Sequence, residues 1–304
     1  MAAKYESKSN RRFKIKKWIP RLEGLPEDTY KYYGGPNFSG RRLVLHNAIL
    51  RMVLKTCRKS SNPQAIMMMG GPASGKSTAL KVLDTAGYTA IDSDAIKGEL
   101  PEYQKAIRAG AKNAAAMAHE ESAHLADEAL RKTVARGCNV ILDGTGKNAE
   151  KYSRLMSMFH ARGYTVRLVY VHVDPALALP RAIKRADKSG RYVPEYVIEA
   201  AYASIPYNFG QLANRADSWT MFDTSAFPAR FVANKEANGA PEIYRPDLLE
   251  DFLRRFPQRT ALKMANPSRR NPMRNPAPIN AKAVERALTQ WMRSGMDDGE
   301  TGLG

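Results

Sequence analysis

The stretch Met67–Thr78 reads MMMGGPASGKST, an apolar run followed by a glycine-rich turn that ends in a lysine and two hydroxyl residues. The eight residues from Gly70 to Ser77 fit the pattern G-x-x-x-x-G-K-[ST], in which glycines let backbone N–H groups turn inward around phosphates. The apolar run predicts a strand, and KSTALKVLDTA after the turn predicts a helix whose positive N-terminal dipole favours an anion. The stretch therefore predicts a phosphate-binding loop between a buried strand and a helix.

This loop indicates that a nucleoside triphosphate binds, ATP in the first place and GTP as an alternative, together with Mg²⁺. We expect Lys76 to bridge the outer phosphates and the Ser77 hydroxyl to bind Mg²⁺. The GTPase base-recognition pattern N-K-x-D is absent from the chain, which argues against a GTPase. The residues expected to cradle the nucleotide are Gly70, Gly71, Pro72, Ala73, Ser74, Gly75, Lys76, Ser77 and Thr78.

Strand and helix signals alternate from Ala65 onward. Short apolar segments that read as strands are AIMMM (65–69), YTAID (88–92), CNVILD (138–143), TVRLVYVHV (165–173) and SWTMFD (218–223). Between the second and third strands we expect one long helix that runs to about Ala135 and stops at Gly137. The alternation predicts an α/β fold, a P-loop kinase-type parallel sheet of about five strands flanked by helices.

The net charge of +18 is concentrated near the start of the chain. Residues 1–60 carry 15 Lys or Arg against 4 Asp or Glu, whereas residues 61–240 carry 22 against 18. We expect a basic N-terminal arm (1–40), a P-loop domain (41–262), an Asn-Pro-rich linker (263–280), and a C-terminal amphipathic helix with an acidic tail (281–304). The arm indicates a polyanion such as nucleic acid, or else a solubilising tail. The helix over 281–293 is expected to dock on a protein partner or on its own domain.

Two further features of the sequence concern the cellular compartment in which the protein is expected. No run approaches the roughly 20 apolar residues that a membrane-spanning helix needs, so we expect no membrane span. Cys57 and Cys138 are the only cysteines, too few for a disulfide or zinc framework. A cytoplasmic protein is the expectation.

Acidic residues follow two of the predicted strands. Asp92 and Asp94 stand at the carboxyl end of the second strand, and Asp143 ends the third, at the edge where ligands bind in open α/β sheets. Small kinases place a carboxylate here to take the proton of the hydroxyl that accepts the phosphoryl group. Asp is also common as a helix N-cap, which is the structural alternative for the first pair.

Basic residues suited to a lid follow the fourth strand. The stretch RAIKRADKSGRYVPE places Arg181, Arg185 and Arg191 around a glycine-containing loop. Arginines in a lid can neutralise the charge of a transferring phosphoryl group, although such runs are commonly solvated helix faces. Pro180 is expected to interrupt the helix that carries them.

Four stretches together resemble a known family. GGPASGKST, IDSDAIK, GCNVILDGTGKN and RYVPE occur in the order and spacing of zeta-toxin-like kinases, over roughly residues 62–225. The resemblance implies that Asp94 is the catalytic base, and Arg185 and Arg191 match best to the lid arginines. With Lys76, these are the expected catalytic residues.

The resemblance also implies where the acceptor binds. The acid before G-T-G, usually Glu in the family, is here Asp143, and it forms the acceptor pocket with Thr145. An acid one helix earlier in the family falls near Asp127. Asp92 completes the expected acceptor-binding set.

The implied activity is ATP-dependent phosphorylation of a hydroxyl on a nucleotide-sugar, notably UDP-N-acetylglucosamine, or on a related small acceptor. An antitoxin is a further expected partner. Two alternatives stay open on the residues alone. One is a nucleic-acid end kinase or ATP-dependent nucleic-acid-binding protein, which the basic arm favours. The other is a non-enzymatic interaction protein that retains the kinase fold as a scaffold.

Overall fold

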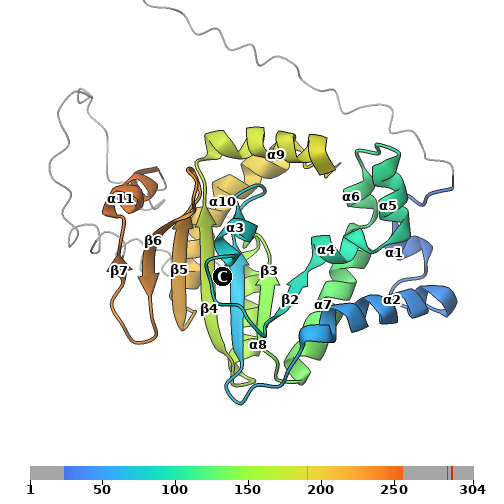
Figure 1. The fold of residues 1–304 in the computed structure, drawn as a ribbon, viewed down its shortest axis with the longest axis horizontal. Coiled ribbons are helices and arrows are strands. Elements are labelled where there is room, and N and C mark those ends of the chain that lie inside the picture. The colour runs from blue at the N-terminus through green and yellow to red at the C-terminus, as the bar shows by residue number, and fades with distance from the viewer. Residues whose placement is uncertain (1–23, 190, 256–285, 287–288, 290–304) are drawn as a thin grey trace, which may run out of the picture.

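A seven-stranded sheet forms the centre of the computed structural model of this chain, which describes residues 24–189, 191–255, 286 and 289 (Figure 1). The strand order is β2-β3-β1-β4-β5-β6-β7. The first five strands in this order are parallel, and β6 and β7 are antiparallel additions at one edge. The predicted α/β fold is confirmed, with seven strands rather than about five.

The strands are β1 (Gln64–Met69), β2 (Thr89–Asp92), β3 (Val140–Asp143), β4 (Thr165–His172), β5 (Ser218–Asp223), β6 (Arg230–Lys235) and β7 (Glu242–Ile243). The first helices are α1 (Thr29–Tyr32), α2 (Gly40–Val53), the 3-10 turn η1 (Leu54–Thr56), α3 (Lys76–Leu80), α4 (Ser93–Gly98), α5 (Pro101–Arg108) and α6 (Ala114–Met117). The later helices are α7 (His119–Ala135), α8 (Ala149–His160), α9 (Pro175–Ser189), α10 (Glu195–Ala213) and α11 (Pro246–Arg255).

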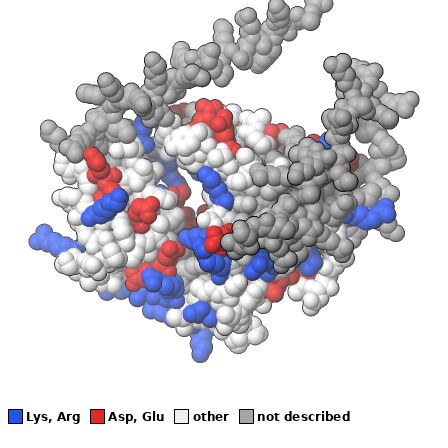
Figure 2. All heavy atoms as spheres, turned by 180° about the vertical axis from the view of Figure 1, so that it is seen from behind, with Lys and Arg blue, Asp and Glu red and all other residues white. Residues whose placement is uncertain are grey.

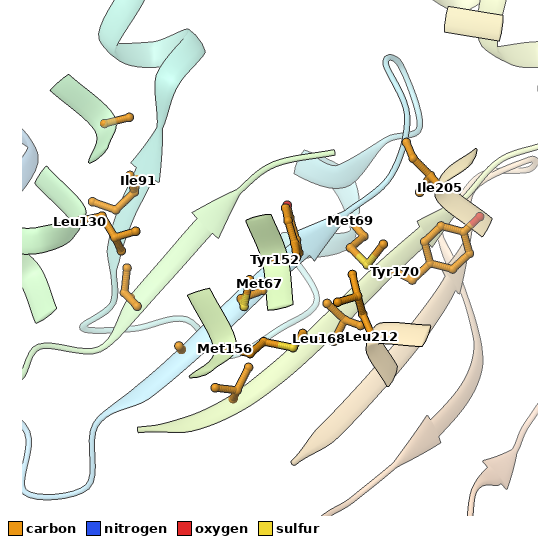
Figure 3. Close-up of a cluster of buried hydrophobic side chains, with 14 of the residues drawn as sticks. Met67, Met69, Ile91, Leu130, Tyr152, Met156, Leu168, Tyr170, Ile205 and Leu212 are labelled. Carbon is orange, nitrogen blue, oxygen red and sulfur yellow. The ribbon is translucent and has the colours of Figure 1, made fainter. Parts of the chain in front are cut away.

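The core lies on both faces of the central strand β1. Met67 and Met69 belong to the larger hydrophobic cluster, with Met156 of α8 and Leu168 of β4 (Figure 3). Ile66 and Met68 belong to a second cluster that includes Ala79 of α3. Successive side chains of a strand point to opposite faces, so this strand is apolar throughout because both faces are covered. Burial of each such side chain contributes roughly 1.5–3 kcal/mol.

The long helix predicted after the second strand is wrong, because four helices, α4 to α7, replace it. Pro101 is the first residue of α5 and disfavours helical backbone at Leu100. Gly110 follows α5 with φ +70°, a left-handed conformation that ends a helix. Gly137, with φ +67°, lies just beyond α7 as predicted.

Two other local features differ from what the sequence led us to expect. Pro180 lies inside α9 without ending it, so the helix continues to Ser189. A proline inside a helix removes one backbone hydrogen bond, which neighbouring turns can tolerate. The β5–β6 hairpin was not predicted, because RFVANK is a short segment whose strand conformation depends on pairing with the edge of the sheet.

Cys57 and Cys138 form one disulfide, which was not predicted from the sequence. The bond joins Cys57, directly after η1, to Cys138, two residues before β3, and the backbones of Lys59 and Cys138 also form an isolated bridge. No helix in the described part of the chain is long and apolar enough to cross a membrane.

Part of the N-terminal segment packs on the domain. Thr29 of α1 is buried and donates from its hydroxyl to the Met117 carbonyl at 3.3 Å. The Tyr33 hydroxyl donates to Glu102 of α5 at 2.5 Å.

On the face opposite to that of Figure 1, acidic and basic side chains are interspersed (Figure 2), in line with the near balance of charge in residues 61–240. Residues 1–23 of the predicted arm, the predicted linker and nearly all of the predicted C-terminal helix lie outside the described residues.

Candidate active site

The predicted phosphate-binding loop lies between β1 and α3, the position expected from the sequence (Figure 1). Gly75 has φ +81° as the residue before α3, a conformation that strains any residue with a side chain. Gly71 is needed for a different reason, since a Cβ atom there would lie 2.6 Å from the ring of Tyr202. The glycines therefore serve both the turn and a close approach of α10.

Carbonyl groups of the loop are held by residues far away in the sequence. Tyr202 of α10 donates from its hydroxyl to the Pro72 carbonyl at 2.9 Å. Thr224, directly after β5, donates to the Ser74 carbonyl at 2.6 Å. These two hydrogen bonds fix the backbone of the loop relative to α10 and to the end of β5. Ser74 Oγ is buried and makes no hydrogen bond within the described residues, so this hydroxyl can donate to a phosphate bound in the loop.

Lys76 lies over the loop beside an acid of the next strand. Its ammonium donates to the Gly70 carbonyl at 3.1 Å and lies 4.0 Å from Asp143 Oδ1. Burial lowers the pKa of Lys76, and Asp143 acts in the opposite sense. Burial raises the pKa of Asp143, against the effect of Lys76. Asp143 Oδ1 is buried without a hydrogen bond among the described residues, so both groups are suited to exchange this contact for a ligand.

Asp92 and Asp94 follow β2 and have different environments. Asp92 is the N-cap of α4, and its Oδ1 accepts from the N–H groups of Asp94 and Ala95 at 2.8 and 3.2 Å. It is paired with Asp143 across β2 and β3. Asp92 therefore has the role of a helix N-cap, which was the structural alternative to ligand binding. The side chain of Asp94, by contrast, is 48% exposed.

Two cations hold the carboxylate of Asp94. Lys97 donates to Oδ1 at 3.1 Å, and Arg191 forms an ion pair with Oδ2. Burial alone would raise the pKa of Asp94, but the charges of Lys97 and Arg191 outweigh it and lower the pKa. Asp94 is therefore an ionised carboxylate, which is the form that can accept a proton.

Arg185 of α9 lies in the same electrostatic cluster. Burial and the positive charge of Arg191 lower its pKa, whereas Asp94 and Tyr103 raise it. Arg181, one helical turn earlier, donates instead to the Ser225 carbonyl at 3.3 Å. The structure thus brings together the two arginines that the sequence assigned to the lid.

The remaining two predicted acceptor residues, Thr145 and Asp127, make different contacts. Thr145 follows β3, and its carbonyl accepts from Gly70 N–H at 3.0 Å, which joins the G-T-G turn to the phosphate-binding loop. Asp127 of α7 is exposed and pairs with Lys151 of α8 at 3.4 Å. Within the described residues, no hydrogen bond or ion pair links Asp127 to Asp94 or Lys76.

Several site residues were not predicted. Lys97 had a sequence signal, because its i, i+3 spacing from Asp94 places both on one helix face. Tyr202 and Thr224 had none, because they lie 130 and 150 residues from the carbonyls that they bind. Asn208 of α10 is a third case; its amide donates to the carbonyls of Gly146 and Lys147 at 2.8 Å each.

Comparison with known proteins shows to which family the chain is similar. The sequence profile of the family described as zeta toxin matches residues 48–227. A toxin zeta from Enterococcus hirae is 21% identical over 161 residues, which cover 50% of this chain and 56% of that protein. A toxin zeta from Streptococcus pyogenes is 20% identical over 176 residues, covering 55% and 61%. The chain therefore matches less than two thirds of the length of these relatives.

Solved structures show the same fold at low sequence identity. One belongs to the PezAT chromosomal toxin–antitoxin system of Streptococcus pneumoniae, with a TM-score of 0.56 and 15% identity over 84% of this chain and 98% of that one. Another is AvrRxo1-ORF1:-ORF2 with ATP, with a TM-score of 0.59 and 15% identity over 91% and 99%. At such identity the likeness establishes the fold alone. The family profile covers more than half of the 304 residues, and the chain belongs to the zeta toxin family.

Proposed function

We propose that this protein is an ATP-dependent kinase that phosphorylates a hydroxyl of a nucleotide-sugar of the UDP-N-acetylglucosamine kind, or of a related small acceptor. The observation that carries the proposal is the set of charges around the loop lysine. The residues whose charges act on Lys76 are Asp143, Arg185, Asp94 and Asp92. These are residues that the sequence assigns to catalysis and to the acceptor, and they come from three separate segments. ATP in the related AvrRxo1-ORF1:-ORF2 structure supports the choice of nucleotide.

In the proposed reaction, Asp94 takes the proton of the acceptor hydroxyl as that oxygen forms its bond to the γ-phosphorus. The bond from the γ-phosphorus to its bridging oxygen breaks, and ADP leaves with the electron pair. Lys76, Arg185 and Arg191 neutralise the charge on the phosphoryl oxygens during transfer. Asp92, Asp127, Asp143 and Thr145 are proposed to bind the acceptor.

Mg²⁺ fits the residues at the loop. Ser77 is exposed in the first turn of α3, where its hydroxyl can bind the ion. Mg²⁺ at nucleotide sites is held by one or two protein oxygens, with phosphates and water supplying the rest. When bound, the ion would neutralise phosphate charge.

The test is transfer of label from γ-labelled ATP to three acceptor conditions: UDP-N-acetylglucosamine, a 5′-hydroxyl oligonucleotide, and no acceptor. We expect label in the nucleotide-sugar. The variant Asp94→Asn should lose transfer by about 100-fold or more while still binding ATP. The matched control is Glu99→Gln, an exposed acid just after α4, which should behave as wild type.

Each outcome of this test favours one class of protein. Label in the oligonucleotide alone would favour the nucleic-acid end kinase and overturn the nucleotide-sugar proposal. ATP binding without transfer to any acceptor would favour an interaction protein that retains the kinase fold. Full activity of Asp94→Asn would overturn the assignment of the base.

The proposal extends to partners and compartment. Because the PezAT structure comes from a toxin–antitoxin system, we propose that an antitoxin neutralises this protein. The cytoplasm, where ATP and nucleotide-sugars occur together, is the proposed location. We propose that the basic arm over residues 1–40 binds a polyanion and that the segment 281–293 binds a protein partner. Co-expression with the gene adjacent in the genome, followed by co-purification and measurement of growth, tests the antitoxin.

A further inference from the structure

Lys97 is a lysine in an unusual place. Its side chain is 6% exposed, although it lies on the short helix α4 next to an exposed acid. Lysine is almost never buried unless it is paired. Its ammonium lies 3.1 Å from Asp94 Oδ1, and this is an i, i+3 contact within one helix. The backbone of α4 therefore sets the relation between the two side chains.

The two oxygens of Asp94 are held by cations that differ in exposure and origin. Lys97 holds Oδ1 from the interior. Arg191 holds Oδ2 from the connection between α9 and α10, with 37% of its side chain exposed. Arg191 lies 97 residues from Asp94 in the sequence and belongs to a separate segment. One contact is thus built into the helix, and the other depends on where the α9–α10 connection lies.

We propose that Lys97 is a positioning residue, which keeps the Asp94 carboxylate ionised and oriented when Arg191 leaves it. The inference rests on the proposed function, because it assumes that Asp94 is the catalytic base. An acceptor hydroxyl can approach Asp94 only at an oxygen that is open to solvent. Oδ2 is the oxygen that becomes available once Arg191 moves to the phosphoryl group, since Lys97 occupies Oδ1.

The charges support different roles for Lys97 and Arg191. If Arg191 moves to the phosphoryl oxygens, Asp94 loses one of the three positive charges that lower its pKa, those of Lys97, Arg191 and Arg185. Lys97 then remains as the nearest counter-charge, so the carboxylate keeps its ionised form until it takes the hydroxyl proton at Oδ2. Without Lys97 the same movement would leave Asp94 with no adjacent ammonium, and its side chain would be free to rotate.

Several other groups face this pair and bear on its titration. They are Arg185 of α9, Tyr103 of α5, Lys76 of α3, Asp92 before α4 and Asp143 at the end of β3. Loss of the Lys97 charge should raise the pKa of Asp94, because the ionised form loses a favourable partner. The acidic limb of the pH profile of kcat/KM should therefore move to higher pH.

The experiment compares Lys97→Met with Lys97→Arg and with a control, Lys105→Met. Lys105 is an exposed lysine of α5, for which no ion pair is found among the described residues. The first readout is titration of the Asp94 side-chain carboxyl by ¹³C NMR, with the signal assigned by its loss in Asp94→Asn. The second is the pH profile of phosphoryl transfer, and the third is ATP affinity.

We expect Lys97→Met to raise the Asp94 pKa, to shift the acidic limb upward and to lower kcat/KM by about 100-fold, with ATP affinity unchanged. Lys97→Arg should restore part of the activity because it keeps the charge. An unchanged NMR titration and pH profile in Lys97→Met would overturn the proposal. If the wild type transfers phosphate to no acceptor, the proposed function fails, whereas the NMR titration still decides whether Lys97 controls Asp94. Should Lys97→Met fail to fold, the titration of Asp94 in Arg191→Met decides: a pKa that then lies well above that of an ordinary carboxyl, as burial without a counter-charge would produce, would overturn the role of Lys97.

Discussion

Arg42 of α2 donates from Nε and Nη2 to both carboxylate oxygens of Glu121 of α7, at 2.6 and 2.7 Å. The Glu121 side chain is fully buried, and that of Arg42 is 7% exposed. His46 Nε2 lies 2.6 Å from Glu121 Oε1, and Arg42 Nη1 also binds Glu102. A charge network in the interior therefore attaches the N-terminal helix α2 to α5 and α7.

The variant Arg42→Met should lower the free energy of unfolding by about 3–5 kcal/mol, because it leaves Glu121 as a buried charge without its main partner. Urea denaturation of the purified protein measures this change. Arg41→Met, at the exposed neighbouring position, is the matched control and should change stability by less than about 0.5 kcal/mol. Equal stability of the two variants would show that the network does not hold α2 to the domain.

Stability should also depend on pH through Glu121. Burial raises its pKa, but hydrogen bonds from His46 and Arg42 outweigh burial and lower the pKa from its ordinary 4.5 to about 2. A pKa that is lower in the folded state adds stability above the unfolded value, and this stability is lost as the pH falls. We expect the loss between pH 4.5 and 2, measured by urea denaturation across this range. Glu121→Gln should lack this component, and an identical pH dependence in both proteins would contradict the assignment.

Gly71→Ala should weaken ATP binding. The added Cβ would lie 2.6 Å from the Tyr202 ring, so the loop or α10 must shift at a cost of about 1–3 kcal/mol. We expect a loss of affinity of about tenfold, measured by isothermal titration calorimetry. Gly98→Ala is the control, because a Cβ at Gly98 meets nothing within 4 Å. Unchanged affinity in Gly71→Ala would mean that the contact with α10 does not shape the loop.

The disulfide should contribute to stability. Cys57 and Cys138 are 81 residues apart, and closing a loop of this size in the unfolded chain is worth about 4.5 kcal/mol in the chain-entropy model. A reducing agent should therefore lower the melting temperature of the wild type to that of the double variant Cys57→Ser, Cys138→Ser. The double variant itself should not respond to the reductant. Two free thiols in the unreduced wild type, measured with a thiol reagent, would contradict the bond.

Much of the fold follows from short-range patterns in the sequence. The phosphate-binding loop from Gly70 to Ser77, the five parallel strands and the acids after β2 and β3 were all predicted. Their signals are local, because a buried strand is a short apolar run and the loop requires glycines at fixed positions. The hairpin of β6 with β5 was missed, since its strand conformation depends on pairing at the sheet edge.

The tertiary structure decided which side chains meet. The sequence by itself identified Asp94, Lys76 and Arg191 as candidate site residues. It placed them after the second strand, in the loop after the first strand and after the fourth strand. Only the folded chain brings Arg191 onto Asp94 across 97 residues, Tyr202 onto Pro72 across 130, and Thr224 onto Ser74 across 150. The packing of the whole sheet and its helices decides which residues meet over such sequence separations. A local sequence pattern does not predict these contacts. The burial of Lys97, whose spacing from Asp94 is visible in the sequence, likewise depends on the helices that cover α4.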